Sequence, residues 1–312
     1  MDITYLLFLQ NIRAATGGIF DSVFLYITTL GDDFTLMVWV CGIYWCVDKA
    51  AGIYLMFNFH IANFANQLIK ITACVYRPWI RDGRVAPLEA AKGAATGYSF
   101  PSGHTAKAVG VWGGLAESMN VFKPLRIFLW GLALTVGFSR NYLGVHTPQD
   151  VLVSVGIGVI FLKVMEKLLV WVEEKEKRDV AVCVIGIGLA IALLIYGRLK
   201  SYPIDVVDGK LLVDPASMIN GSIRGAGGAI GLLLGWFWER RGIKFKEMGD
   251  TVEGKLFCFL IGIAGLLIIM KVIPNVVVKI FPGQIGTFLN GLLVPLYIIG
   301  VYPWCVKRLK TN

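Results

Sequence analysis

The stretch KLFCFLIGIAGLLIIMKV, residues 255–272, sets the fold class of this chain. Between Lys255 and Lys271 it contains no charged side chain. A helix that crosses a bilayer needs about 20 predominantly apolar residues. Because the run is continuous and does not alternate apolar with polar residues, it predicts a membrane-spanning helix rather than a barrel strand.

The composition extends this prediction to the whole chain. Of its 312 residues, 56% are hydrophobic and 16% are charged, and the mean hydropathy is +0.67. A soluble domain carries about 25% charged residues. The composition excludes a disordered chain, a nucleic-acid-binding protein and a disulfide scaffold. We therefore expect an all-α fold, a polytopic transmembrane helical bundle of about nine spans.

The apolar runs divide the chain into predicted spans. They cover residues 34–47, 52–75, 102–119, 125–138, 148–170, 180–196, 219–238, 255–272 and 286–306. Three segments follow: an interfacial amphipathic segment at 1–33, a catalytic core of transmembrane helices at 34–197, and additional helices packed on that core at 198–312. In the seventh span, Gly227, Gly231 and Gly235 recur every four residues, which indicates close helix packing rather than a phosphate loop.

The net charge of +9 predicts how the chain is oriented. With nine spans, the loops at 76–101, 139–147, 198–218 and 272–285 share one side. Lys and Arg are more numerous on the other side, which carries the C-terminus. Cationic loops favour the cytoplasm. We therefore expect an integral membrane protein with a cytoplasmic C-terminus, and the four loops facing outward or into a lumen.

The first cluster of polar residues ends the second predicted span. Lys70 and Arg77 lie nearly two helical turns apart, so a continuous helix would point both the same way. Pro78 is expected to end that helix just after Arg77. Lipid would not solvate a polar stripe that ends in these two cations, so the stripe is expected to face the bundle interior or a water-filled cavity. Snorkelling to the headgroups is the alternative; it explains Arg77 better than the deeper Lys70.

Two further clusters lie on the same predicted side. In Pro101-Ser102-Gly103-His104, Ser102 is a potential N-cap, and the free amides of a helix start form an anion site beside His104. An incidental interfacial histidine is the alternative. The third cluster holds Ser139-Arg140, His146 and Asp150. Thr147 and Asp150 also form a capping-box pattern, which would explain Asp150 without catalysis, yet it places a carboxylate beside His146.

Together these residues point to phosphoryl transfer. Three cations and a helix N-terminus suit the oxygens of a phosphate. Two histidines in opposite protonation states supply a nucleophile and an acid. No carboxylate cluster suits Mg²⁺ or Ca²⁺, and no His/Cys set suits Zn²⁺, so we expect a reaction without a metal or other cofactor. The six cysteines are expected to pack within apolar runs.

At these residues the sequence resembles the type 2 phosphatidic acid phosphatase superfamily, which also includes vanadium haloperoxidases and glucose-6-phosphatases. Its three-part signature is matched in order by Lys70 with Arg77-Pro78, by Pro101 to His104, and by Ser139-Arg140 with His146 and Asp150. The resemblance implies the helical core of that superfamily. It implies that His146 attacks phosphorus, Asp150 orients it and His104 protonates the leaving oxygen. Lys70, Arg77, Ser102, Gly103 and Arg140 would hold the phosphoryl oxygens.

The resemblance leaves the substrate open. A lipid phosphate whose tail stays in the bilayer is the first expectation, which makes membrane lipids the partners and excludes nucleic acid. A soluble sugar phosphate is the second, because nine spans resemble the glucose-6-phosphatases. A transporter or scaffold that keeps the anion site is the third. Arg224 either contacts a headgroup or snorkels to the interface. The sequence carries no signal for an oligomeric state.

Overall fold

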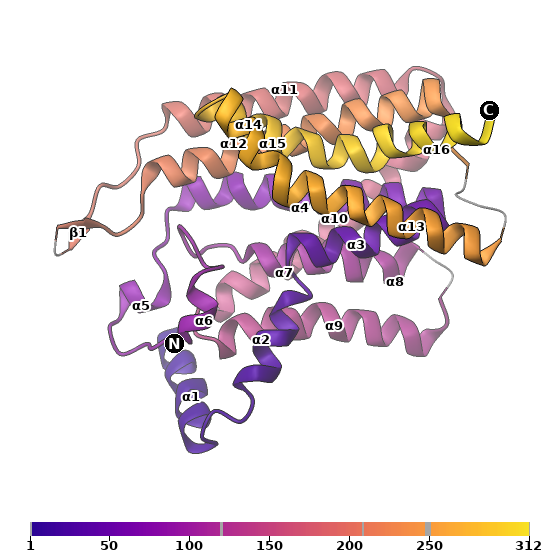
Figure 1. Ribbon diagram of the computed structural model, residues 1–312. Helices are drawn as coiled ribbons and strands as arrows, with labels where there is room; N and C mark the ends of the chain where they lie inside the picture. The colour runs from indigo at the N-terminus through magenta and orange to yellow at the C-terminus, as the bar shows by residue number, and fades with distance from the viewer. Residues whose placement is uncertain (1, 119–120, 208, 247–250, 312) are drawn as a thin grey trace. The chain divides into compact units, whose positions relative to one another are not determined.

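The computed structural model describes residues 2–118, 121–207, 209–246 and 251–311, and helices dominate it (Figure 1). The first half of the chain forms α1 (Asp2–Ala15), α2 (Asp21–Thr29), α3 (Asp33–Gly42), η1 (Ile43–Val47), α4 (Lys49–Ala73), α5 (Pro78–Arg81), α6 (Glu89–Lys92), α7 (Gly103–Ala108), η2 (Val109–Gly113), α8 (Gly114–Ser118), α9 (Lys123–Tyr142) and α10 (Pro148–Glu174). Each η segment is a π-helical turn that continues the preceding helix.

The second half continues in the same way. It forms α11 (Arg178–Leu199), α12 (Pro215–Trp238), η3 (Glu239–Ile243), α13 (Val252–Leu267), η4 (Ile268–Val272), α14 (Ile273–Ile280), α15 (Gln284–Leu296), η5 (Tyr297–Val301) and α16 (Tyr302–Thr311). Between α11 and α12, the strands β1 (Val206–Val207) and β2 (Lys210–Leu211) pair antiparallel. The helical fold class is thus as expected from the sequence.

Helix occupies each predicted span, but nine membrane crossings are not confirmed. By length and composition, three helical stretches in the described part of the chain can cross a membrane: Arg178–Leu199, Val252–Ile280 and Gln284–Leu309. A fourth exists if α2 and α3 with η1, which are bent by 52°, form one broken span. Helices that carry site residues, such as α4 with Lys70, also carry side-chain amides and are less apolar. The predicted end of the third span, residue 119, lies outside the described residues.

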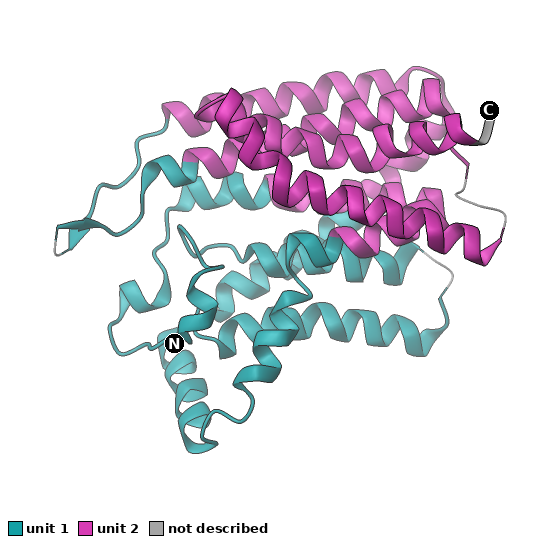
Figure 2. Ribbon diagram, in the orientation of Figure 1, with its two compact units in different colours: residues 1–36, 65–162, 200–218 teal, residues 37–64, 163–199, 219–312 magenta. Residues whose placement is uncertain are grey.

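The chain divides into two compact units (Figure 2). Unit 1 comprises residues 1–36, 65–162 and 200–218, and unit 2 comprises residues 37–64, 163–199 and 219–312. The predicted residues of all three signature parts belong to unit 1.

In unit 1, an apolar cluster fixes the loop between α9 and α10. The cluster consists of Ala91, Ala95, Tyr142, Leu143 and Val145, with Phe24, Leu25, Trp79 and Leu88 packed against it. The amide of Leu88 also donates to the carbonyl of Leu143 at 3.1 Å. This packing holds the short segment that carries His146.

In unit 2, α12 packs closely against α15. A Cβ added at Gly227 or Gly231 would collide with the backbone carbonyl of Phe288 or Leu292, and one at Gly291 with that of Arg224. Only glycine lets the two backbones approach this closely. The predicted packing role of the glycine stripe is therefore confirmed at Gly227 and Gly231.

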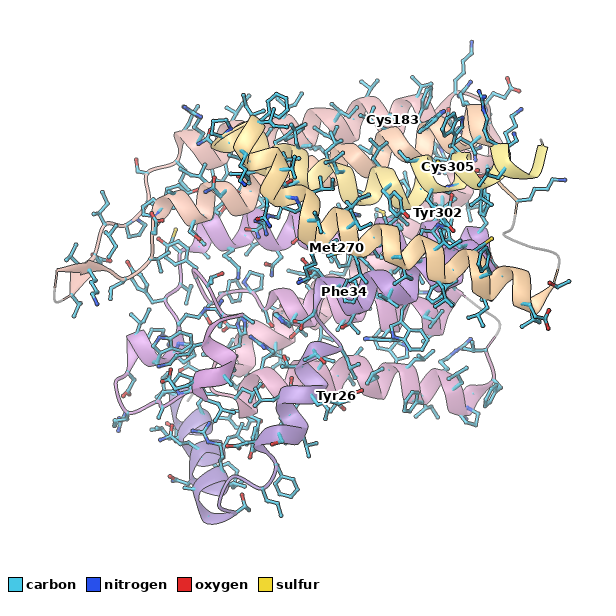
Figure 3. All side chains as sticks on the ribbon, in the orientation of Figure 1. Tyr26, Phe34, Cys183, Met270, Tyr302 and Cys305 are labelled. Atoms are coloured by element: carbon cyan, nitrogen blue, oxygen red, sulfur yellow. The ribbon has the colours of Figure 1, made fainter. Side chains whose placement is uncertain are left out.

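Figure 3 draws the side chains on the helices, and many large apolar ones on the long helices are exposed. On α11, Val184 and Ile185 are 66% and 63% exposed, and on α13 Phe257 is 66% exposed. Long helices with continuous apolar surfaces suit a lipid environment. These helices identify the chain as an integral membrane protein.

Candidate active site

His146 lies in the short loop between α9 and α10 and is buried. Its Nδ1 lies 3.1 Å from the Oδ2 of Asp150, and its Nε2 lies 2.9 Å from the Nη1 of Arg77. Its carbonyl accepts from the side-chain amide of Asn141 at 2.9 Å. Both ring nitrogens are thus held, and the backbone is fixed as well.

The start of α10 places Asp150 beside this imidazole. The Oδ2 of Asp150 accepts from the amide of Thr147 at 2.9 Å, and the hydroxyl of Thr147 accepts from the amide of Asp150 at 3.3 Å. This is the reciprocal pairing of a capping box, as predicted. The same oxygen also accepts from the hydroxyl of Ser99 at 2.5 Å. The cap therefore fixes the carboxylate in contact with His146.

Arg77 determines which tautomer of His146 is present. Its Nε donates to the carbonyl of Gly97 at 3.0 Å, its Nη2 to that of Thr96 at 2.8 Å, and its Nη1 to that of Val145 at 3.0 Å. A guanidinium donates only. The Nε2 of His146 must therefore accept from Nη1, which leaves the proton on Nδ1, where Asp150 accepts it. The lone pair of Nε2 is therefore directed at Arg77.

The structure corrects the expectation that Lys70 and Arg77 lie on one helix. α4 ends at Ala73, and Cys74 adopts a left-handed conformation with φ of 49°. Arg77 is extended, with ψ of 151°, because the ring of Pro78 disfavours helix at the preceding residue. Lys70 and Arg77 therefore do not share a helical stripe. Backbone carbonyls, rather than helical spacing, orient Arg77.

Burial lowers the pKa values of His146 and Arg77, which both lie in loops. Burial and the adjacent Arg77 guanidinium hold the pKa of His146 well below its ordinary value of 6.5. Burial, with the charge of Arg140 adding to it, lowers the pKa of Arg77 to about 9. At neutral pH, His146 is thus an uncharged base and Arg77 remains a cation.

The second signature part, residues 101–104, contacts the third at Asp150. Ser102 is the N-cap of α7, as predicted, and its Oγ accepts from the hydroxyl of Thr105 at 2.8 Å. Its amide donates to the carbonyl of Asp150 at 3.1 Å, which joins α7 to α10. The side chain of Asn66 lies beside Gly103, and a Cβ added there would lie 3.3 Å from its Oδ1.

Lys70 is buried beside the loop that precedes α7. Its Nζ donates to the carbonyl of Tyr98 at 3.1 Å, one residue before Ser99. An ammonium has three protons to donate. The lysine is thus held beside the Ser99–Asp150–His146 group.

Arg140, near the end of α9, is fully buried. Its Nη1 donates to the hydroxyl of Thr28 at 2.6 Å. Its Nε and Nη2 are buried and have no hydrogen-bond partner among the described residues. Its carbonyl accepts from the amides of Val145 and His146 at 3.1 and 3.3 Å. A buried guanidinium with two unused donors is costly unless it binds an anion.

His104, in the first turn of α7, completes the set. Its Nε2 lies 2.8 Å from the Oδ1 of Asp32. All eight predicted site residues thus lie in unit 1, on helices labelled in Figure 1 and the loops that follow them. Over the described residues, no group of three or more His, Cys, Asp or Glu side chains could hold a metal ion.

Two family descriptions match the chain. The description of the PAP2 superfamily matches residues 51–174, and that of the PAP2 superfamily phosphatase, transmembrane extension, matches residues 223–312. The first match contains every signature residue, and the two together cover most of the chain.

The chain belongs to the PAP2 superfamily.

Three curated relatives illustrate the range of this superfamily. The chain is 33% identical over 120 residues to the undecaprenyl-diphosphatase of Sulfolobus acidocaldarius, 37% of this chain and 55% of the relative. It is 29% identical over 135 residues to the phosphatidylglycerophosphatase B of Bacillus subtilis, 41% of this chain and 60% of the relative. It is 24% identical over 174 residues to the glucose-6-phosphatase catalytic subunit 1 of Haplochromis nubilus, 48% of this chain and 49% of the relative.

The chain thus spans between about half and three-fifths of the length of the curated PAP2 relatives that it matches. No solved structure matches it significantly.

Four further residues contact the signature residues of this PAP2 site and belong to none of the three sequence clusters. They are Thr28, Asp32, Ser99 and Asn141, which contact Arg140, His104, Asp150 and His146 respectively. Thr28 and Asp32 come from the N-terminal segment that was expected to be interfacial. Ser99 is the one that the sequence hints at, because it lies in a polar loop two residues before the second signature part.

Proposed function

We propose that the protein is a metal-independent phosphatase that hydrolyses a phosphomonoester or diphosphate of a membrane lipid through a phosphohistidine intermediate. The observation that carries this proposal is a neutral histidine next to a buried arginine whose N–H groups lack hydrogen-bond acceptors among the described residues. The Nε2 of His146 is a free base held by Arg77, and the neighbouring Arg140 has two buried donors without a partner among the described residues. A phosphoryl group supplies the anion that such donors need.

The reaction would proceed in two displacements. The Nε2 of His146 attacks phosphorus while the bond to the leaving oxygen breaks, and His104 gives that oxygen a proton. Asp150 accepts from Nδ1 and offsets the positive charge that develops on the ring. Water then attacks phosphorus after giving a proton to His104, and the phosphorus–nitrogen bond breaks to release phosphate.

The cations would hold the phosphoryl oxygens in both steps. Arg77, Arg140 and Lys70 converge on this site from three segments, and the amides at the start of α7 add neutral donors. Arg77 would turn the proton that it now gives to Nε2 toward a phosphoryl oxygen, which frees the lone pair for attack.

Two observations favour a lipid substrate. Two of the similar proteins are named for lipid substrates, an undecaprenyl diphosphate and a phosphatidylglycerophosphate. The chain also has long helices with exposed apolar faces, which keep the protein in the bilayer where such substrates lie. We further propose that the site faces the outside or a lumen and that the C-terminus is cytoplasmic, because cationic residues are more numerous on the C-terminal side.

A soluble sugar phosphate is the second candidate. The relative named as a glucose-6-phosphatase matches the longest stretch of the chain among the three, 174 residues. In this reading the same two displacements would act on a water-soluble phosphate ester.

One assay tests both candidates. The purified protein in detergent, with EDTA present, receives undecaprenyl diphosphate, phosphatidylglycerophosphate, phosphatidic acid and glucose 6-phosphate. We expect phosphate release from at least one lipid. Release from glucose 6-phosphate alone would establish the second candidate, and release from no substrate would contradict both and favour a binding protein or transporter.

The variant His146→Ala tests the mechanism in the same assay. We expect it to fold and to release phosphate at least about 10³-fold more slowly, because it lacks the nucleophile. His60→Gln is the matched control, since that histidine lies in unit 2 and is not a signature residue. Full activity of His146→Ala would disprove the proposed intermediate.

A further inference from the structure

Residues 28–33, which we call the α2–α3 corner, lie against the active site within unit 1. α2 and α3 with η1 are bent by 52° at this corner. The hydroxyl of Thr28 accepts from Arg140, and the carbonyl of Leu30 accepts from the indole of Trp112 at 2.9 Å. Asp33 forms an ion pair with Lys107. The corner is therefore attached at several points to helices that carry signature residues.

Asp32 is the corner residue that contacts a reacting group. Its Oδ1 lies 2.8 Å from the Nε2 of His104. The imidazole side chain is 13% exposed, whereas the carboxylate is 44% exposed. Because a carboxylate accepts only, the Nε2 of His104 carries a proton, and Nδ1 is the nitrogen left to exchange a proton with substrate or water.

Gly31 fixes the distance between the corner and α7. A Cβ at this position would lie 2.8 Å from the Cγ1 of Val136 and 3.3 Å from the Cβ and the carbonyl oxygen of His104. The corner backbone therefore lies close to the first turn of α7, and a side chain at position 31 would collide with Val136 of α9. The contact between Asp32 and His104 is built into the packing rather than formed by two long, mobile side chains.

The charges around His104 give this contact its importance. Arg140, Lys107 and Asp32 are the charged groups that act on the imidazole. The two cations oppose a positive charge on the ring, and Asp32 is the one anion among the three. A histidine that must donate a proton needs a partner that stabilises its charged form.

We propose that Asp32 is a positioning residue that orients His104 and stabilises its protonated form, so that the site contains two Asp–His pairs. This role rests on the proposed phosphatase function. When the phosphorus–oxygen bond breaks, the proton on Nδ1 of His104 moves to the leaving oxygen, while the proton on Nε2 stays hydrogen-bonded to Asp32. When water attacks the phosphohistidine, Nδ1 takes a proton from that water and the charged pair is restored.

The first experiment compares leaving groups. Asp32→Asn, Asp32→Glu and Asp21→Asn are assayed with a lipid phosphate and with p-nitrophenyl phosphate, whose leaving group needs no proton. Asp21 is the matched control, because it fastens the same α2 to Tyr142 at 2.9 Å and is not a contact of His104. We expect Asp32→Asn to lower kcat/KM for the lipid on the order of 10²-fold. For p-nitrophenyl phosphate, kcat/KM should stay within a few-fold, and Asp32→Glu should recover most of the lipid activity.

The second experiment reads the imidazole directly and needs no turnover. The chain has three histidines, so the ¹⁵N spectrum of labelled protein can be assigned with His60→Gln and His146→Ala. We expect the charged fraction of His104 at a fixed acidic pH to be smaller in Asp32→Asn than in the unaltered protein and in Asp21→Asn.

The two experiments separate the two proposals. Equal losses for both substrates in Asp32→Asn and Asp21→Asn, or an unchanged His104 spectrum, would show that Asp32 only fastens the corner. If the unaltered protein hydrolyses no phosphate ester, the proposed function is wrong, and the spectrum still decides whether Asp32 controls the charge of His104.

Discussion

Arg140 shows how a single residue reveals the ligand that a site is built for. It is fully buried, yet two of its three nitrogens have no hydrogen-bond partner among the described residues. Taking an ion out of water costs several kcal/mol unless its donors are matched. Such a residue is explained by binding rather than by stability. Its neighbour Arg77, by contrast, already donates to three backbone carbonyls.

Replacing Arg140 should therefore separate stability from activity. We expect Arg140→Met to lower phosphate release on the order of 10²–10³-fold, because in the proposed mechanism it removes donors to the phosphoryl oxygens. Its melting temperature without ligand should equal or exceed that of the unaltered protein. Orthovanadate should raise the melting temperature of the unaltered protein and not that of Arg140→Met. Arg126→Met, an exposed change on the same helix α9, is the control. Equal stabilisation of both proteins by vanadate would contradict the assignment.

In the proposed mechanism, the depressed pKa of His146 sets the acidic limb of the pH profile. The proposed nucleophile is the neutral imidazole, and burial with the charge of Arg77 keeps it neutral below the ordinary pKa of 6.5. We therefore expect the fall of kcat/KM on acidification, which follows the protonation of His146, to occur below pH 6.5. In Arg77→Gln one cause of the depression is lost, so this fall should move to higher pH, whatever activity remains.

The control for the pH profile is Arg81→Gln. Arg81 lies four residues further along and pairs with Asp2 at 2.7 Å, outside the signature. Its profile should match that of the unaltered protein. If acidification already lowers the activity of the unaltered protein above pH 6.5, His146 is not held neutral.

Sequence reasoning could identify the site residues that belong to local patterns and could not identify those joined by folding. Thr147 and Asp150 lie within one helical turn, so their capping pattern is visible in the sequence and is found as predicted. The partner of Arg140 is 112 residues away, and that of His104 is 72 residues away. No periodicity links such positions. The helical stripe expected for Lys70 and Arg77 was wrong because Cys74 leaves the helix before Arg77.

At the scale of elements, long apolar runs made the helices predictable, and their polar faces made the membrane crossings hard to count. Each predicted span contains helix within a few residues of its expected ends. The π-helical turns within several of these helices have no signature in the apolar pattern. The division of the chain into two units was equally hidden, since α4 and α10 each contribute residues to both.

The contact between α12 and α15 allows a test at this scale. Gly231→Ala would place a methyl group against the backbone carbonyl of Leu292, which cannot move as a flexible side chain would. We expect a loss of about 1–3 kcal/mol of stability, measured as earlier thermal denaturation in detergent.

Gly188→Ala on α11 is the matched control for this change. Apart from the nearby backbone of its own helix and its chain neighbours, no atom lies within 4 Å of the added Cβ. Alanine should therefore keep or slightly raise stability through its higher helix propensity. If the two variants melt alike, the close backbone approach of α12 and α15 does not exist.

At the scale of the molecule, the orientation in the membrane is open to direct measurement. Gly93 is an exposed residue of the loop between α6 and α7, and a Cβ added there would meet no atom within 4 Å beyond its chain neighbours. A protease site inserted at Gly93 should be cut from outside sealed cells. A site added after the C-terminus should be cut only after the membrane is opened with detergent. The reverse pattern would place the phosphatase site in the cytoplasm.

The carbonyl of Arg140 accepts from the amide of His146, and the amide of Ser102 donates to the carbonyl of Asp150. These main-chain links connect the loop that carries His146 to the end of α9, and the start of α10 to the start of α7. Because main-chain hydrogen bonds do not depend on which side chains lie around them, we expect substitutions in the surrounding helices to change the neighbourhood of the site more readily than this framework. Such insulation offers a physical reason why one superfamily contains proteins named for an isoprenoid diphosphate, a glycerophospholipid and a sugar phosphate.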